Sequence, residues 1–168
     1  MKQQQFKKIA NSYKNLIYNQ AFYSTANKED AEDITQEVLL KLWHNVDNIN
    51  RNSIKAWILK VTRNLCIDYS RKKREQSLDK LSDEAQQSTV FIDPQSNPEI
   101  EAINADLMEK IICVIDQLPE KMRTIMIMRD IQDVKYKVIA ETMELPLNSV
   151  KAYLHRGRKF LLKSLSNY

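Results

Sequence analysis

The chain contains a single glycine, Gly157, among 168 residues. Average glycine usage of about 7% would give roughly a dozen. Glycine adopts positive φ most readily, so a chain almost without it is a poor candidate for hairpins, barrels or dinucleotide-binding units. Glycine-rich phosphate loops are excluded, because neither G-x-G-x-x-G nor a Walker sequence can be written with one glycine. The sequence therefore predicts an all-α fold, built as one domain or two small ones.

Apolar residues recur at helical spacing in two groups, which a polar stretch separates. The first group predicts three amphipathic helices, and Asn27 followed by Asp30 predicts an N-cap for the second of them. Residues 76–98 lack periodicity, are rich in Ser, Gln and Asp, and include two prolines. We therefore expect two small helical domains, 1–75 and 100–168. A flexible linker, 76–99, joins them and fixes neither relative to the other.

The net charge of +4 is unevenly distributed along the chain. Residues 1–75 carry +6, residues 76–105 carry −5, and residues 106–168 carry +3. Two basic lobes joined by an acidic connector favour a polyanionic partner, most simply nucleic acid. Scattered surface charge on an ordinary protein is the alternative explanation.

The third predicted helix carries a basic stripe opposite its apolar face. The stripe comprises Lys60, Arg63, Asn64, Ile67, Arg71 and Arg74, spaced three or four apart and extended by Lys72 and Lys73. Residues 60–74 hold six basic side chains against one acid, and Tyr69 adds a ring suited to base stacking. This pattern suits a nucleic-acid backbone. A solvated face, with cations favoured by the helix dipole, is the alternative.

The second predicted helix is acidic on one side. Asp33, Gln36 and Glu37 share a face, and Asp30 lies one turn earlier. Such a face should avoid DNA, and it could be either a solvated helix start or a protein-docking surface. A carboxylate metal site is disfavoured, because no Glu-x-x-His accompanies the acids and His44 lies on another face.

The last third of the chain predicts a helix-turn-helix. Residues 136–143 form a short helix, residues 144–146 a break, and residues 148–165 a longer basic helix. Residues 147–168 contain five basic side chains and no acid. The exposed start of the longer helix offers side chains suited to base edges and phosphates. A plain helical hairpin with a charged surface is the alternative.

Three motifs carry a family resemblance. Residues 30–43 resemble region 2.2 of bacterial extracytoplasmic-function (ECF) sigma factors, and residues 56–74 resemble their −10-reading helix. Residues 118–123, 136–141 and 149–158 resemble their region 4. The motifs come in the family's order and cover nearly the whole chain. The resemblance implies a specificity subunit that brings core RNA polymerase to promoters and promotes −10 melting. It implies no enzymatic activity, cofactor or metal.

The resemblance also implies roles for individual residues. The polymerase-binding residues would be Asp30, Asp33, Gln36 and Glu37. The −10 contacts would be Asn48, Asn50, Arg51, Lys60, Arg63, Asn64, Tyr69, Arg71 and Lys72. The −35 contacts would be Asn148, Ser149, Lys151, Ala152, His155, Arg156 and Lys159. The family often has glycine just before the first helix of the motif, where this chain has Asp133, and in the turn, where it has Glu144. The turn must therefore be made without a positive-φ specialist or with a strained residue.

The implied partners are the β′ clamp helices and β flap of core RNA polymerase, promoter DNA, and an anti-sigma factor. No small-molecule substrate is implied. The acidic linker would run through the polymerase's RNA-exit path. A cytoplasmic location is expected: no apolar run nears the ~20 residues of a membrane span, the N-terminus lacks a secretory apolar region, and Cys66 and Cys113 suit a reduced pair.

Two functions from other classes agree less well with the sequence. A one-component helix-turn-helix regulator would use its N-terminal lobe to bind a small ligand or to dimerise. Such a lobe has no need of an acidic face beside a basic stripe. A nuclease built on Asp30, Glu32, Asp33 and Glu37 fails, because these carboxylates point to different sides of one helix.

Overall fold

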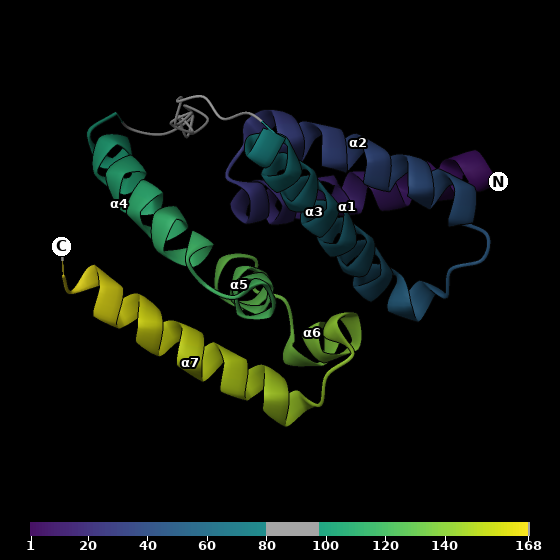
Figure 1. Ribbon diagram of the computed structural model, residues 1–168. Helices are drawn as coiled ribbons and strands as arrows, with labels where there is room; N and C mark the ends of the chain where they lie inside the picture. The colour runs from purple at the N-terminus through teal and green to yellow at the C-terminus, as the bar shows by residue number, and fades with distance from the viewer. Residues whose placement is uncertain (80–97, 168) are drawn as a thin grey trace.

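The computed structural model describes residues 1–79 and 98–167, and the side chains of residues 1–78 and 105–167. Within these ranges the regular structure is all helical and forms two groups (Figure 1). Lobe 1 contains α1 (Lys2–Thr25), α2 (Lys28–Asn45), the short η1 (Arg51–Ser53) and α3 (Ile54–Asp79). Lobe 2 contains α4 (Pro98–Asp116), α5 (Glu120–Met126), the π-helical η2 (Ile127–Ile131), α6 (Tyr136–Met143) and α7 (Leu147–Leu165). The predicted all-α fold is confirmed.

None of the helices in the described part of the chain is long and apolar enough to cross a membrane.

Lobe 1 is held together by apolar faces that its three long helices turn toward one another. Ile17 of α1, Ile34 of α2 and Ile58 of α3 are fully buried in one cluster. The Asn27 side chain accepts a hydrogen bond from the Asp30 backbone N–H at 3.0 Å, which confirms the predicted cap of α2. That bond satisfies one of the donors left open at a helix start, so α2 begins where the sequence indicates.

The single glycine, Gly157, lies at a closely packed position in lobe 2. Gly157 has no positive φ, and a Cβ placed there would overlap the Met126 sulfur and crowd the Met122 side chain. The glycine therefore permits a close approach of α7 to α5. Positive φ falls instead on Ala26, Asp133 and Glu144, at 52°, 53° and 54°. The expectation of a helix-turn-helix turn made by a non-glycine residue is confirmed.

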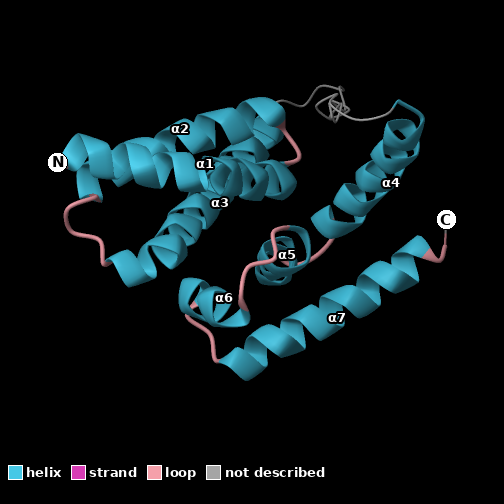
Figure 2. Ribbon diagram, turned by 180° about the vertical axis from the view of Figure 1, so that it is seen from behind, coloured by secondary structure: helices cyan, strands magenta, loops and turns pink. Residues whose placement is uncertain are grey.

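The two lobes pack against each other, contrary to the expectation that nothing fixes their relative position. Figures 1 and 2 both show α5 and α6 next to α3, with α7 on the side away from lobe 1. Leu59 of α3 is fully buried in the apolar core of lobe 2, and Leu16 and Tyr23 of α1 pack against the same core. Gln132 Nε2 donates to Gln20 Oε1 at 2.8 Å across the boundary. The two lobes are therefore held together by direct contacts between their own side chains.

The ends of the connector differ slightly from the predicted linker, 76–99. Helix α3 continues to Asp79, and α4 begins at Pro98, where proline suits the first helical position. The remaining residues, 80–97, and the path expected for the acidic linker lie outside the described residues.

Candidate nucleic-acid and protein interfaces

The acidic face of α2 is open. Asp33 and Gln36 are exposed and Glu37 is half-buried, and among the described residues none of the three forms an ion pair. Asp30 differs, because its Oδ2 lies 2.5 Å from Lys73 Nζ and its side chain is only 16% exposed. We define the acidic face as Asp33, Gln36 and Glu37.

Tyr69, expected among the −10 contacts, lies within electrostatic range of this acidic face. Its half-buried ring belongs to the edge of the lobe 1 core. Burial and then the carboxylates of Asp33, Glu37 and Asp30 raise the pKa of Tyr69. These carboxylates repel phosphate, so Tyr69 is placed at the border between the acidic face and the basic stripe.

The loop before α3 exposes polar side chains and is ordered by a side-chain hydrogen bond. Asn48, Asn50 and Arg51 are all exposed, whereas Val46, at the end of α2, is buried. The Asn50 side chain accepts a hydrogen bond from the Asn52 backbone N–H at 3.0 Å and so caps η1. The loop is thus locally ordered by one of its own side chains.

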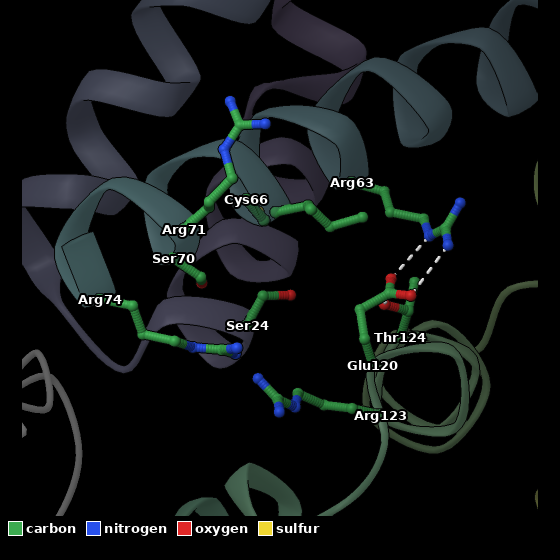
Figure 3. A pocket seen from close by; sticks show the side chains of 10 residues that line it. Ser24, Arg63, Cys66, Ser70, Arg71, Arg74, Glu120, Arg123 and Thr124 are labelled. Atoms are coloured by element: carbon green, nitrogen blue, oxygen red, sulfur yellow. Dashed lines mark hydrogen bonds and ion pairs between the residues drawn. The ribbon is translucent and has the colours of Figure 1, made fainter.

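Two cations of the basic stripe are engaged by acids of lobe 2. Arg63 donates from Nε and Nη2 to the two carboxylate oxygens of Glu120, at 2.7 and 2.9 Å (Figure 3). Lys60 Nζ donates to Glu144 Oε1 at 2.5 Å. We call these two contacts the interlobe ion pairs. Asn64, Arg71 and Lys72 are exposed. The lobes therefore divide the stripe into a covered part and an open part.

Both acids respond to these contacts. Burial alone would raise the pKa of Glu120, but hydrogen bonds from Arg63 and Thr124, with the charges of Arg63 and Arg123, hold it below the ordinary value. The hydrogen bond from Lys60 and its charge lower the pKa of Glu144, which is exposed. Both carboxylates are thus stabilised in the ionised form that pairs with the stripe.

The helix-turn-helix presents an open basic surface. Glu144 ends α6 in the left-handed conformation, and Leu145 N–H donates to the Ala140 carbonyl at 3.0 Å, which closes the turn. Arg158 is turned toward Asp130, with which it forms two hydrogen bonds. Of the expected −35 residues, Ser149 is half-buried and the others are exposed: Asn148, Lys151, Ala152, His155, Arg156 and Lys159. The structure brings them together on one side of α7.

Comparison with known proteins identifies the family. The Sigma-70 region 2 model matches residues 9–76, and the Sigma-70, region 4 model matches residues 108–161. The ECF RNA polymerase sigma factor SigW of Bacillus subtilis is 30% identical over 168 residues, which cover 97% of this chain and 90% of SigW. This chain belongs to the ECF RNA polymerase sigma factors.

Other relatives agree with this family. The B. subtilis sigma factor SigV is 31% identical over 150 residues, covering 89% of this chain and 84% of SigV. The sigma factor RpoE of Bartonella quintana, solved in complex with the anti-sigma factor NepR, aligns with a TM-score of 0.77 over 96% of each chain at 18% identity. CnrH, solved with the cytosolic domain of CnrY, aligns with a TM-score of 0.67 at 16% identity over 96% of this chain and 88% of CnrH. Both solved structures share the fold.

The sigma factor directs RNA polymerase to specific promoters, where it initiates transcription; its family consists of initiation factors and not enzymes.

Sequence reasoning found the stripe, the acidic face and the recognition helix, but missed that Glu120 and Glu144 occupy the stripe. One signal was available for Glu144: it stands in the helix-turn-helix turn, where the family often has glycine. The sequence held no comparable signal for Glu120.

Proposed function

We propose that the acidic face of α2 docks this sigma factor on the β′ clamp helices of core RNA polymerase. The observation that carries the proposal is an exposed face, with two carboxylates, on a lobe that is otherwise basic. Asp33 and Glu37 supply the charge, and Gln36 adds a donor and an acceptor. Asp30 contributes less, because Lys73 already neutralises it.

Lobe 1, residues 1–75, also captures the −10 element. The loop residues Asn48, Asn50 and Arg51 take up an extruded base, while the basic stripe holds the phosphates of the separated strand. Unstacking a base costs a few kcal/mol, which the pocket and the phosphate contacts recover. Lys60, Arg63, Asn64, Arg71 and Lys72 form these contacts. Tyr69 stacks at the edge, next to the acidic face.

Lobe 2, residues 100–168, reads the −35 element. The recognition helix α7 enters the major groove by its N-terminal half, as in other helix-turn-helix proteins. Asn148 and Lys151 are suited to base edges, and Arg156 and Lys159 to phosphates. The lobe also contacts the β flap of the polymerase, and the linker 76–99 spans the distance between the two promoter elements.

The sigma factor acts in the cytoplasm, where core polymerase and promoter DNA are found, and an anti-sigma factor holds it inactive. Two observations support the anti-sigma partner. Two solved structures that share this fold are complexes: the sigma factor RpoE with the anti-sigma factor NepR, and CnrH with the cytosolic domain of CnrY. In this chain both the acidic face and the −35 surface are exposed, so a second protein could cover them.

The test of the docking face is a run-off transcription assay with core polymerase, combined with a pull-down of the core enzyme. Glu37→Lys should weaken core binding at least tenfold while leaving the melting temperature nearly unchanged, since surface changes usually alter stability by no more than about 0.5 kcal/mol. Glu109→Lys, on the exposed side of α4, makes the same charge change elsewhere and should bind core normally. Wild-type core binding by Glu37→Lys would reject the proposal.

A further inference from the structure

A cavity of about 290 Å³ lies between the lobes. Its walls come from three helices: Ser24 of α1, a row of α3 residues that includes Arg63, Arg71 and Arg74, and Arg123 of α5 beside Glu120 (Figure 3). A water molecule takes about 30 Å³ of liquid, and ligand pockets begin at about 300 Å³. The cavity lies just below this range, so only a small molecule or ion could occupy it.

The cavity is strongly positive. Four arginines line it against one carboxylate, that of Glu120, and both oxygens of this carboxylate are engaged by Arg63. The thiol of Cys66, another wall residue, adds no negative charge, because burial raises its pKa to about 12. Arg71 lies near Asp68, at 3.7 Å, and points away from the centre (Figure 3). Arg123 Nη1 lies 3.5 Å from Asp116 Oδ1, which partly balances its charge, so of the four arginines only Arg74 has no carboxylate partner among the described residues.

These two guanidinium groups converge from opposite lobes. Figure 3 shows Arg74 of α3 and Arg123 of α5 pointing toward each other, with the Ser24 hydroxyl nearby. Among the described residues no carboxylate pairs with Arg74. Like charges that face each other repel, and the repulsion grows in a partly enclosed site where water screens poorly. An anion between them would turn this repulsion into attraction.

Arg123 is already positioned to hold such an anion. Its Nη2 donates to the carbonyl oxygens of Asp116 and Leu118, both at 3.1 Å, which fixes the guanidinium plane at the end of α4. Its Nε is buried and has no hydrogen-bond partner within the described residues. A buried donor without a partner is costly, and an arginine held in place loses little entropy on binding.

We propose that this cavity binds a small phosphorylated molecule, with a phosphate group held between Arg74 and Arg123. A phosphate offers several acceptor oxygens and a double negative charge, which match the Arg74 guanidinium, the unpartnered Nε–H of Arg123 and the Ser24 hydroxyl. Because the walls belong to both lobes, the site exists only while the lobes are packed together. The ligand therefore stabilises this arrangement by mass action. If the stripe has the proposed −10 role, the ligand also keeps Lys60 and Arg63 paired and opposes promoter melting.

The first experiment measures binding of inorganic pyrophosphate to the full chain by calorimetry, at constant ionic strength. We expect saturable binding of one pyrophosphate per chain. Arg74→Gln should weaken it at least tenfold. Lys121→Gln, which removes an exposed cation two residues from Arg123, should change the affinity by less than twofold. Absence of saturable binding, or equal weakening by both variants, would overturn the proposal. This result does not depend on the −10 role of the stripe.

The second experiment separates a small ligand from DNA. A single-stranded thymidine oligonucleotide replaces pyrophosphate in the same titration. We expect Arg74→Gln to weaken oligonucleotide binding only slightly, because Arg74 is one of several cations of the stripe, whereas it weakens pyrophosphate binding at least tenfold. If only the oligonucleotide required Arg74, the cavity would belong to the DNA path and the proposal would be wrong.

Discussion

Arg63 of lobe 1 donates two parallel hydrogen bonds to the Glu120 carboxylate of lobe 2, at 2.7 and 2.9 Å. The two residues are 57 positions apart in the chain. The bidentate geometry uses the same guanidinium edge that a DNA phosphate would take. Arg63 therefore cannot hold Glu120 and a phosphate at once through that edge. In the proposed −10 role, strand capture requires this pair to open.

Neutralising both acids of the interlobe ion pairs should improve access to the basic stripe. We expect the double variant Glu120→Gln, Glu144→Gln to bind single-stranded −10 DNA about 3- to 10-fold more tightly, because Arg63 and Lys60 no longer have charged partners. The gain is modest, since solvent-exposed ion pairs contribute little. Fluorescence anisotropy with a labelled oligonucleotide from a mapped promoter measures it.

The control for this variant must make the same change of net charge. Glu109→Gln, Glu141→Gln replaces two exposed acids of lobe 2 that form no ion pair within the described residues. It should raise the affinity less than the first variant does. Equal gains would mean that only net charge matters and that the interlobe ion pairs do not restrict the stripe.

Acid should weaken the contact between Arg63 and Glu120. The pKa of Glu120 in the folded protein is lowered from its ordinary value of 4.5. A lowered folded pKa means that the pair stabilises the fold above pH 4.5 and that this contribution is lost as pH falls through the lowered pKa. In urea unfolding, the stability difference between wild type and Glu120→Gln should be constant between about pH 5 and 7 and shrink in stronger acid. A difference that persists unchanged in acid would contradict this explanation.

Leu59 should be a stability determinant for both lobes. It belongs to α3 of lobe 1 but is fully buried in the core of lobe 2. Leu59→Ala leaves a cavity there and should lower the free energy of unfolding by about 2–5 kcal/mol. Leu78→Ala, on the same helix at a residue that is 80% exposed, should change it by no more than about 0.5 kcal/mol. Urea titration measures both.

The packing of Leu59 also determines whether the two lobes of the free protein tumble as one body. With Leu59 in the core of lobe 2, ¹⁵N relaxation should give one rotational correlation time for both lobes of the wild type. Leu59→Ala should give two shorter times as the lobes separate. Two distinct times in the wild type would show that the packing of the lobes does not persist in solution.

The sequence predicted local structure well and long-range contacts poorly, for physical reasons that particular residues illustrate. Helix 136–143 was predicted with the bounds that the structure has, because its apolar spacing ends at a break before Pro146. The Asn27 cap is a contact across three residues and can be recognised in the sequence.

The contacts between lobes have no such local signature. Periodicity shows that α3 is amphipathic, but two cores border this helix and spacing cannot tell which one takes Leu59. The pairing of Lys60 with Glu144 joins residues 84 positions apart, and exposed charges have many equivalent partners before the fold is known. The sequence therefore predicts the basic stripe but not its partial coverage by lobe 2.

Enlarging the single glycine should destabilise lobe 2. Gly157 lies where α7 crosses α5, and the Cγ atoms of Met122 and Met126 would each be 3.1 Å from an added Cβ. Leucine favours a helix over glycine by about 1 kcal/mol, but overpacking a core costs about 1–3 kcal/mol. Several added carbons cannot be accommodated by small shifts of two methionines, so Gly157→Leu should lower the free energy of unfolding. Ala152→Leu, at an exposed position of the same helix, should not. Adding Met126→Ala to Gly157→Leu should restore part of the loss, because the new side chain then fills the space that Met126 vacates. Equal stabilities for the two leucine variants, with no recovery in the double variant, would mean that the approach of α7 to α5 does not depend on glycine.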